Sequence, residues 1–163
     1  MRLLGRLRRL LFPPAGSRRA PQAPAPTYPG DFTGRPDLVY APHPDGRPDP
    51  GEIVWTWVPF EEDHTQGKDR PVLLIGHDGP WLLGLMLTSK DHDAAGPAGA
   101  RDPRYRRRWL DIGVGAWDRQ GRPSEVRVDR VLRIDPGRVR REGAVLDRAR
   151  FDEVSRAVLG TRR

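Results

Sequence analysis

The chain has 163 residues, of which 36% are hydrophobic, and its formal net charge is +7. It contains no cysteine, which excludes disulfides, thiolate metal sites and cysteine nucleophiles. Its four histidines lack the spacing of metal ligands, and no apolar run approaches the roughly 20 residues of a membrane span. We therefore expect no metal, no cofactor and a cytoplasmic protein.

The N-terminal quarter of the chain carries much of the positive charge and most of the proline. Residues 1–12 form a basic amphipathic segment, with leucines on one helical face and arginines on the other. Attachment to anionic lipid or RNA is one interpretation, and we favour the other, an unstructured start of the chain. Residues 13–50 hold 11 of the 18 prolines, which predicts an extended, largely irregular extension. Phe32, Val39 and Tyr40 could still pack part of it against a domain spanning residues 51–160.

The first predicted strand covers residues 52–60 and is followed by a polar loop over residues 61–69. Both faces of this strand are fairly apolar, so we expect Trp55 and Trp57 to pack in the core. Base stacking is the alternative for whichever tryptophan faces solvent. The acidic residues 61–63 predict a solvated face, with cation binding as the alternative.

A hairpin is predicted from residues 70–76 and 81–89, which flank an Asp-Gly-Pro turn. Polar side chains lie at the ends of the two strands that are distant from the turn. If the strands pair, Arg70 and Thr88 come together at one rim of the sheet. This rim is the candidate site, and the polar residues that extend it are Lys68, Ser89 and Lys90.

The next segment, residues 90–108, is a Gly/Ala/Pro-rich loop that ends in a basic cluster. An aromatic side chain among cations suits a polyanion, and a solvated loop is an equal alternative. The cluster consists of Arg104, Tyr105, Arg106, Arg107 and Arg108. His92, four residues after Thr88, is a possible general acid or base.

The remaining chain predicts short strands and one helix. Residues 109–114 form a strand, and residues 124–134 form another that bends near its end. In the latter, we expect Val126 and Val128 to point inward and the charged residues Glu125, Arg127 and Asp129 to point outward. Residues 139–145 are one more strand or a connection, and residues 148–159 form a helix that ends at Gly160, with Asp147 as its N-cap. Five or six strands with one helix predict an α+β, mainly β, small twisted barrel.

Four motifs in order resemble the PemK/MazF family of toxin ribonucleases. They are Gly51-Glu52-Ile53-Val54-Trp55, then Gly67-Lys68-Asp69-Arg70-Pro71 followed by an apolar strand, then the strand ending in Thr88-Ser89, and finally the strand 124–135 before the helix 151–159. The resemblance covers about residues 51–160. It implies an SH3-like or CcdB-like barrel, a homodimer and metal-free cleavage of single-stranded RNA. It also implies a cognate antitoxin protein, and it gives the catalytic roles to Arg70 and Thr88.

The chemistry of RNA cleavage is consistent with these two residues. Attack by the 2′-OH on the neighbouring phosphate leaves a cyclic phosphate or 3′-phosphate and a 5′-OH end. Arginine binds phosphate bidentately and stays charged, so stabilisation of the phosphate is the role we expect for Arg70. Thr88 would hold the phosphate or orient the 2′-OH. The alternatives are an Arg70 ion pair with Asp69 or Glu52, a Thr88 that caps a strand, and a non-catalytic barrel that binds RNA or a protein.

Overall fold

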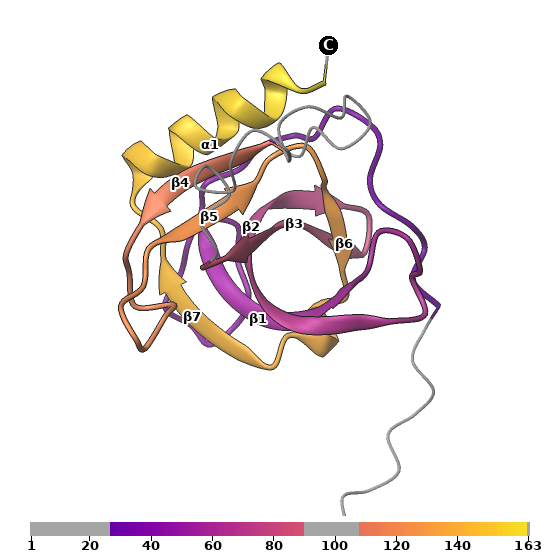
Figure 1. Cartoon of the computed structure of the whole chain (residues 1–163), viewed down its shortest axis with the longest axis horizontal. Helices are drawn as coiled ribbons and strands as arrows, with labels where there is room; N and C mark the ends of the chain where they lie inside the picture. The colour runs from indigo at the N-terminus through magenta and orange to yellow at the C-terminus, as the bar shows by residue number, and fades with distance from the viewer. Residues whose placement is uncertain (1–26, 90–107, 163) are drawn as a thin grey trace, which may run out of the picture.

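The structure, a computed structural model, describes residues 27–89 and 108–162. These residues contain seven strands and one α-helix, and the strands form one antiparallel sheet that curls into a half-barrel (Figure 1). The strands are β1 (Glu52–Pro59), β2 (Gly67–Asp78), β3 (Trp81–Thr88), β4 (Trp109–Gly113), β5 (Ser124–Arg127), β6 (Leu132–Ile134) and β7 (Arg141–Val145). A 3₁₀ turn, η2 (Pro136–Arg138), precedes β7, and α1 (Arg148–Gly160) ends the fold. The predicted α+β, mainly β architecture is confirmed.

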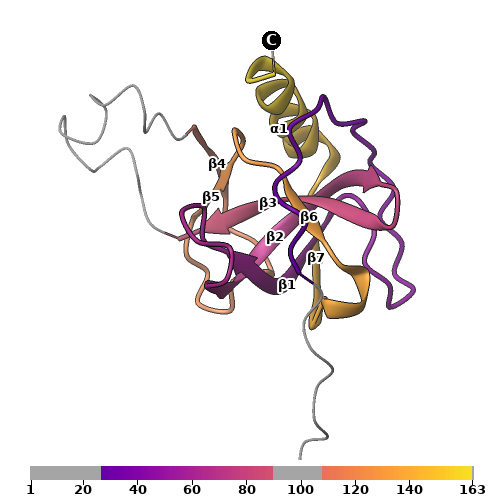
Figure 2. The same ribbon diagram turned by 90° about the vertical axis from the view of Figure 1, so that its right-hand side faces the viewer.

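The sheet has the strand order β4-β5-β3-β2-β1-β7, and β6 also pairs with β3. β2 and β3 form the predicted hairpin, which turns at Gly79 with a positive φ of 58°. β3 is the strand with the most partners, because β5 pairs with its last residues and β6 with its first ones. The hairpin therefore holds the later strands at its two ends (Figure 2).

Two apolar cores lie on the two faces of the curled sheet. The larger core contains the strand residues Ile53, Leu73 and Leu85, and α1 covers it with Phe151, Val154 and Val158. The smaller core contains Val54, Val58, Val72, Leu74, Leu82, Leu132 and Ile134. Because successive side chains of a strand point to opposite faces, the apolar residues on both faces of β1 and β2 supply both cores.

The helix α1 begins and packs as its sequence predicts. The side chain of Asp147 accepts a hydrogen bond of 3.0 Å from the backbone N–H of Arg150, which is the N-cap interaction. The three buried residues of the helix follow a spacing of three and four. Of the residues that the structure describes, none belongs to a helix that is long and apolar enough to cross a membrane.

Residues 27–50 contain no regular strand or helix, but they pack closely on the barrel (Figure 2). The Tyr40 hydroxyl donates to the Leu146 carbonyl at 2.8 Å, and its ring lies 5.0 Å from the Phe151 ring. The backbone N–H of Val39 donates to the Ile75 carbonyl at 2.9 Å. Next to that contact only glycine fits at position 76, because a Cβ there would collide with the Asp37 carbonyl.

Three details of the predicted elements are wrong. β2 begins at Gly67 and pairs with β1 from there, so the polar loop is shorter than residues 61–69. The predicted strand 124–134 is two strands, β5 and β6, that pair with opposite ends of β3. The chain must leave the sheet between β5 and β6 in order to reach both ends of β3. Residues 141–145 also form a strand, so the sheet has seven strands and not five or six.

Candidate functional site

The candidate rim lies where β1, β2 and β3 run side by side. Arg70 of β2 pairs with Thr56 of β1, and Val72 of β2 pairs with Met86 of β3. The pairing of β2 with β3 ends at Val72 and Met86, and continuing this register by two residues brings Arg70 opposite Thr88. Cross-strand partners share a face of the sheet, so this register places the Arg70 and Thr88 side chains on the face of the smaller core.

A pocket of about 210 Å³ opens on this face. Because three arginines line it and arginines attract anions, we call it the anion pocket. It lies between the end of β1, the loop that follows it and the strands β2 to β5. Its charged lining residues are three arginines and two glutamates, and the others are apolar or aromatic. The residues are Arg70, Arg127, Arg130, Glu61, Glu62, Val58, Pro59, Phe60, Met86 and Trp109.

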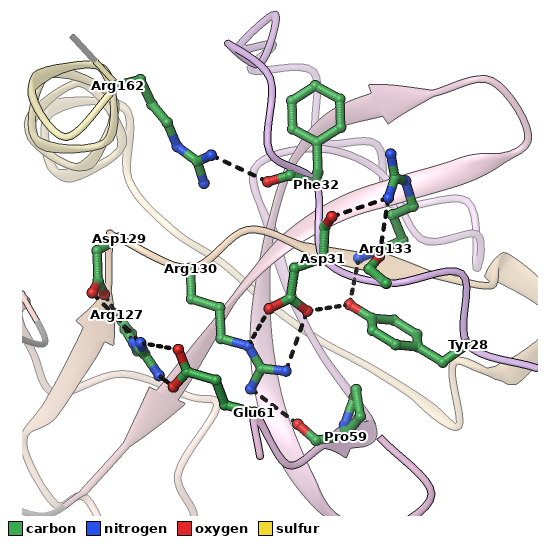
Figure 3. Close-up of polar contacts among 11 residues, drawn as sticks. Tyr28, Asp31, Phe32, Pro59, Glu61, Arg127, Asp129, Arg130, Arg133 and Arg162 are labelled. Atoms are coloured by element: carbon green, nitrogen blue, oxygen red, sulfur yellow. Dashed lines mark hydrogen bonds and ion pairs between the residues drawn. The ribbon is translucent and has the colours of Figure 1, made fainter. Parts of the chain in front are cut away.

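Arg127, from the end of β5, is the most extensively paired of the three arginines (Figure 3). Its side chain is 7% exposed and bonds Glu61 at 2.8 and 3.1 Å and Asp129 at 2.8 Å. Burial alone would lower the pKa of Arg127, but these two carboxylates raise it above its usual value. The guanidinium therefore stays charged, and it holds its fork toward the pocket through the contact with Glu61.

Arg130 is the second buried arginine, with 5% of its side chain exposed. Its Nε and Nη2 donate to the two carboxylate oxygens of Asp31 at 2.8 and 3.2 Å, and Nη1 donates to the Pro59 carbonyl at 2.9 Å. Burial alone would raise the pKa of Asp31, but the bonds from Arg130 and Tyr28 hold it below its usual value. This ion pair joins the N-terminal segment to the pocket.

Arg70 differs from the other two arginines of the pocket. It has no ion pair within residues 27–89 and 108–162. The two carboxylates that were alternatives for it are occupied elsewhere: Asp69 bonds Arg140 at 2.8 Å, and Glu52 accepts the backbone N–H groups of His43 and Asp49 at 3.2 Å each. A half-buried guanidinium beside a pocket, with no carboxylate of the described chain on it, is available to an external anion.

The other predicted site residues lie around the pocket or outside the described residues. Thr88 is 9% exposed, pairs with Glu125 of β5 and does not line the pocket, but alternation along β3 puts it on the face of Met86. Lys68 is exposed and its Nζ lies 6.0 Å from the centre of the Phe60 ring. Ser89 and Arg108 are exposed. Lys90, His92, Arg104, Tyr105, Arg106 and Arg107 fall outside the described residues.

Sequence reasoning missed Arg127, Arg130 and Glu61 as parts of this site. Arg127 and Glu125 were expected to point outward, yet every residue of β5 is buried, and Arg127 bonds Glu61 of the loop after β1. Glu61 is exposed, as expected for a solvated face, and it also pairs with Arg127, which was not expected. The sequence signal that could have revealed Arg127 is its position between two valines at the end of a short strand. A charged residue buried at such a position needs a partner of opposite charge.

The described residues contain no group of three or more His, Cys, Asp or Glu side chains that could hold a metal ion. In a comparison with family models, residues 49–160 match a model. The matching model describes the PemK-like, MazF-like toxin of type II toxin-antitoxin systems. No curated protein matches the chain.

Proposed function

Because the chain belongs to the PemK-like, MazF-like toxins of type II toxin-antitoxin systems, we propose that it is a metal-independent endoribonuclease that cleaves single-stranded RNA. The family consists of toxins that are typically ribonucleases, and a type II toxin has an antitoxin protein as its partner. The observation that supports RNA cleavage is the anion pocket. Three arginines line it, and Arg70 is the one that no carboxylate of the described residues pairs with.

The reaction begins with attack of the 2′-OH on the adjacent phosphorus and ends with release of the 5′-oxygen. The products are a 2′,3′-cyclic phosphate, which water can open to a 3′-phosphate, and a 5′-OH end. Negative charge builds on the two non-bridging phosphate oxygens, so preorganised cations stabilise the transition state. Arg70 fits that role, because its guanidinium keeps its charge and can give two N–H groups to the phosphate.

Arg127 is a second candidate for contact with the phosphate. Its raised pKa speaks against a role as proton acceptor, since the group would have to lose a proton that the fold holds more tightly than usual. It can share the phosphate charge with Arg70 once Glu61 moves away or turns aside. Thr88 would orient the 2′-OH, and His92 keeps the proposed role of acid or base.

For RNA beyond the scissile phosphate, the proposed contacts are the exposed residues Lys68, Ser89 and Arg108, together with Lys90 and residues 104–107, which lie outside the described residues. The lysines and arginines would supply positive charge for the backbone, Ser89 a hydroxyl, and Tyr105 an aromatic ring for a base. A homodimer and inhibition of growth through cleavage of cytoplasmic mRNA complete the proposal. Light scattering of the purified protein gives the number of chains directly.

The test is cleavage of a long single-stranded RNA in EDTA by the unchanged protein and by Arg70→Ala. We expect discrete fragments with 5′-OH ends from the unchanged protein and a loss on the order of 100-fold in the variant, the usual effect of removing one such donor. Arg119→Ala, an exposed arginine outside the pocket, is the matched control and should retain activity. Intact RNA with the unchanged protein would instead favour a barrel that binds RNA or a protein without cleaving.

A further inference from the structure

We propose that the segment 28–34, which precedes the family match, is a working part of the anion pocket, and that Asp31 is a positioning residue for RNA binding there. Asp31 acts through Arg130, whose guanidinium it fixes at the pocket wall so that a phosphate of the RNA backbone can bind it. The inference rests on the proposed function and adds to it a residue from outside the matched residues 49–160.

The geometry of Arg130 supports this role. Its guanidinium has five N–H groups, and three of them bond Asp31 and the Pro59 carbonyl. No other hydrogen bond of this side chain is found in the described part of the protein, although Arg130 lines the pocket. Two donors thus remain for a ligand. The bidentate contact with Asp31 fixes the plane of the fork, and a preorganised fork loses less entropy when it binds a phosphate.

Asp31 also connects to the loop that carries Glu61. The Tyr28 hydroxyl donates to Asp31 Oδ1 at 2.7 Å, and the Tyr28 ring packs edge-on against His64 with 5.0 Å between ring centroids. His64 belongs to the loop between β1 and β2, three residues after Glu61. The segment therefore contacts the pocket wall through Arg130 (Figure 3), and through Tyr28 it contacts the loop whose Glu61 pairs with Arg127.

Two arginines, Arg133 of β6 and Arg162 after α1, hold the segment in this position. Nη1 of Arg133 donates to the Gly30 and Asp31 carbonyls at 3.0 and 3.1 Å, and its guanidinium lies 5.4 Å from the centre of the Phe32 ring. Nη1 of Arg162 donates to the Phe32 carbonyl at 3.2 Å, and Phe32 itself forms a β-bridge with Val131. With its backbone held by these contacts, the segment fixes the position of Asp31.

A purely structural ion pair would affect stability and leave RNA binding unchanged, so the test separates the two quantities. The probe is a single-stranded 2′-O-methyl RNA, which lacks the attacking hydroxyl and is not cut. We compare Asp31→Asn with Asp118→Asn, in which a carboxylate paired with Arg122 at 2.8 Å is changed in the same way at the far end of the β4–β5 hairpin. Melting temperature and Kd are measured for both variants and for the unchanged protein.

We expect both variants to lose some thermal stability, while Kd rises about tenfold in Asp31→Asn alone, because Arg130 is then no longer fixed for binding the phosphate. Cleavage assays should show the same change in KM with little change in kcat, since Asp31 does not touch the reacting atoms. Equal Kd values in Asp31→Asn, Asp118→Asn and the unchanged protein would overturn the inference and leave the ribonuclease proposal standing. Failure of the unchanged protein to bind or cut RNA would overturn both.

Discussion

Glu61 and Arg127 meet fork to fork at the anion pocket, with their oxygen and nitrogen atoms 2.8 and 3.1 Å apart. A carboxylate and a phosphate present similar paired oxygens to a guanidinium. In this position Glu61 therefore occupies the place that a phosphate would take on Arg127. If the pocket binds RNA, Glu61 competes with the substrate.

Replacement of Glu61 by Gln should strengthen RNA binding. The side chain of Glu61 is 47% exposed, so we expect a modest gain of about threefold in affinity for 2′-O-methyl RNA, in line with a partly exposed ion pair. Fluorescence anisotropy at two salt concentrations checks this. Glu62→Gln is the control for a general change in charge, because Glu62 also lines the pocket without an ion pair in the described residues. Weaker binding by Glu61→Gln would contradict the competition.

Arg127→Lys should reduce both cleavage and stability. Lysine keeps the positive charge but cannot bond Glu61 and Asp129 through one planar fork. We expect the free energy of unfolding to fall by about 1–3 kcal/mol, below the range for a fully buried pair because both carboxylates are partly exposed. Urea denaturation and the RNA cleavage assay measure the two effects. Arg122 pairs with Asp118 and 54% of its side chain is exposed, so Arg122→Lys should change neither the cleavage rate nor the free energy of unfolding by much.

Thr88→Val should slow cleavage if the hydroxyl orients the substrate, whereas Thr88→Ser should retain most of the activity. The valine variant keeps the shape of the side chain, so the effect belongs to the hydroxyl. Thr56→Val is the matched change, because Thr56 faces Arg70 from β1 and its hydroxyl bonds the Arg138 carbonyl at 3.4 Å. We expect a loss of about tenfold or more in kcat for Thr88→Val alone. Equal kinetics in the two valine variants would leave Thr88 a structural role.

Tyr40→Phe should lower the free energy of unfolding by about 1 kcal/mol, since it removes a single hydrogen bond to the Leu146 carbonyl. Tyr40→Ala should cost about 2–4 kcal/mol, because the ring also packs against Phe151 in the larger core. Chemical denaturation followed by tryptophan fluorescence gives both values. An alanine variant as stable as the unchanged protein would show that residues 27–50 are not part of the folded unit.

Stability below pH 5 should depend on Asp31. Its pKa is lower in the folded protein than its ordinary value of about 4, because Arg130 and Tyr28 stabilise the charged form against the effect of burial. The unfolded chain then binds the proton first as pH falls, so the contribution of this ion pair is complete only well above pH 4 and is lost as pH falls from about 5 through the lowered pKa of Asp31. Urea denaturation between pH 3 and pH 7 should show a smaller loss for Asp31→Asn than for the unchanged protein.

The hairpin, the helix and the two-sided apolar strands could be predicted because each has a local signal. An Asp-Gly-Pro turn between apolar runs and an Asp N-cap before a spaced apolar stripe are properties of short segments. The rim could be predicted for the same reason, since a hairpin with a known turn determines which distant residues face each other. The division of residues 124–134 into β5 and β6 could not be predicted, because it depends on which parts of β3 remain unpaired.

The buried arginines of the pocket could not be predicted from local patterns. Arg127 and Asp129 alternate with valines in the way that a solvent-facing edge of a strand does, and the same pattern results when another loop covers that face. Arg130 is buried because Asp31, about 100 residues earlier, reaches it. Charges of this kind are placed by their partners, and the partners come from parts of the chain that no short window contains.

β3 pairs at its start with β6, at its end with β5 and along its length with β2. The two chain segments that return to it are therefore positioned by the strand itself and not by the residues that connect them. Since the entropy of closing a loop grows only by about 0.6 kcal/mol for each doubling of its length, residues 90–107 can lengthen, shorten or change composition at little cost to the fold. On the proposed function, the connection between β3 and β4 is therefore a place where relatives could change their RNA preference while the scaffold stays unchanged.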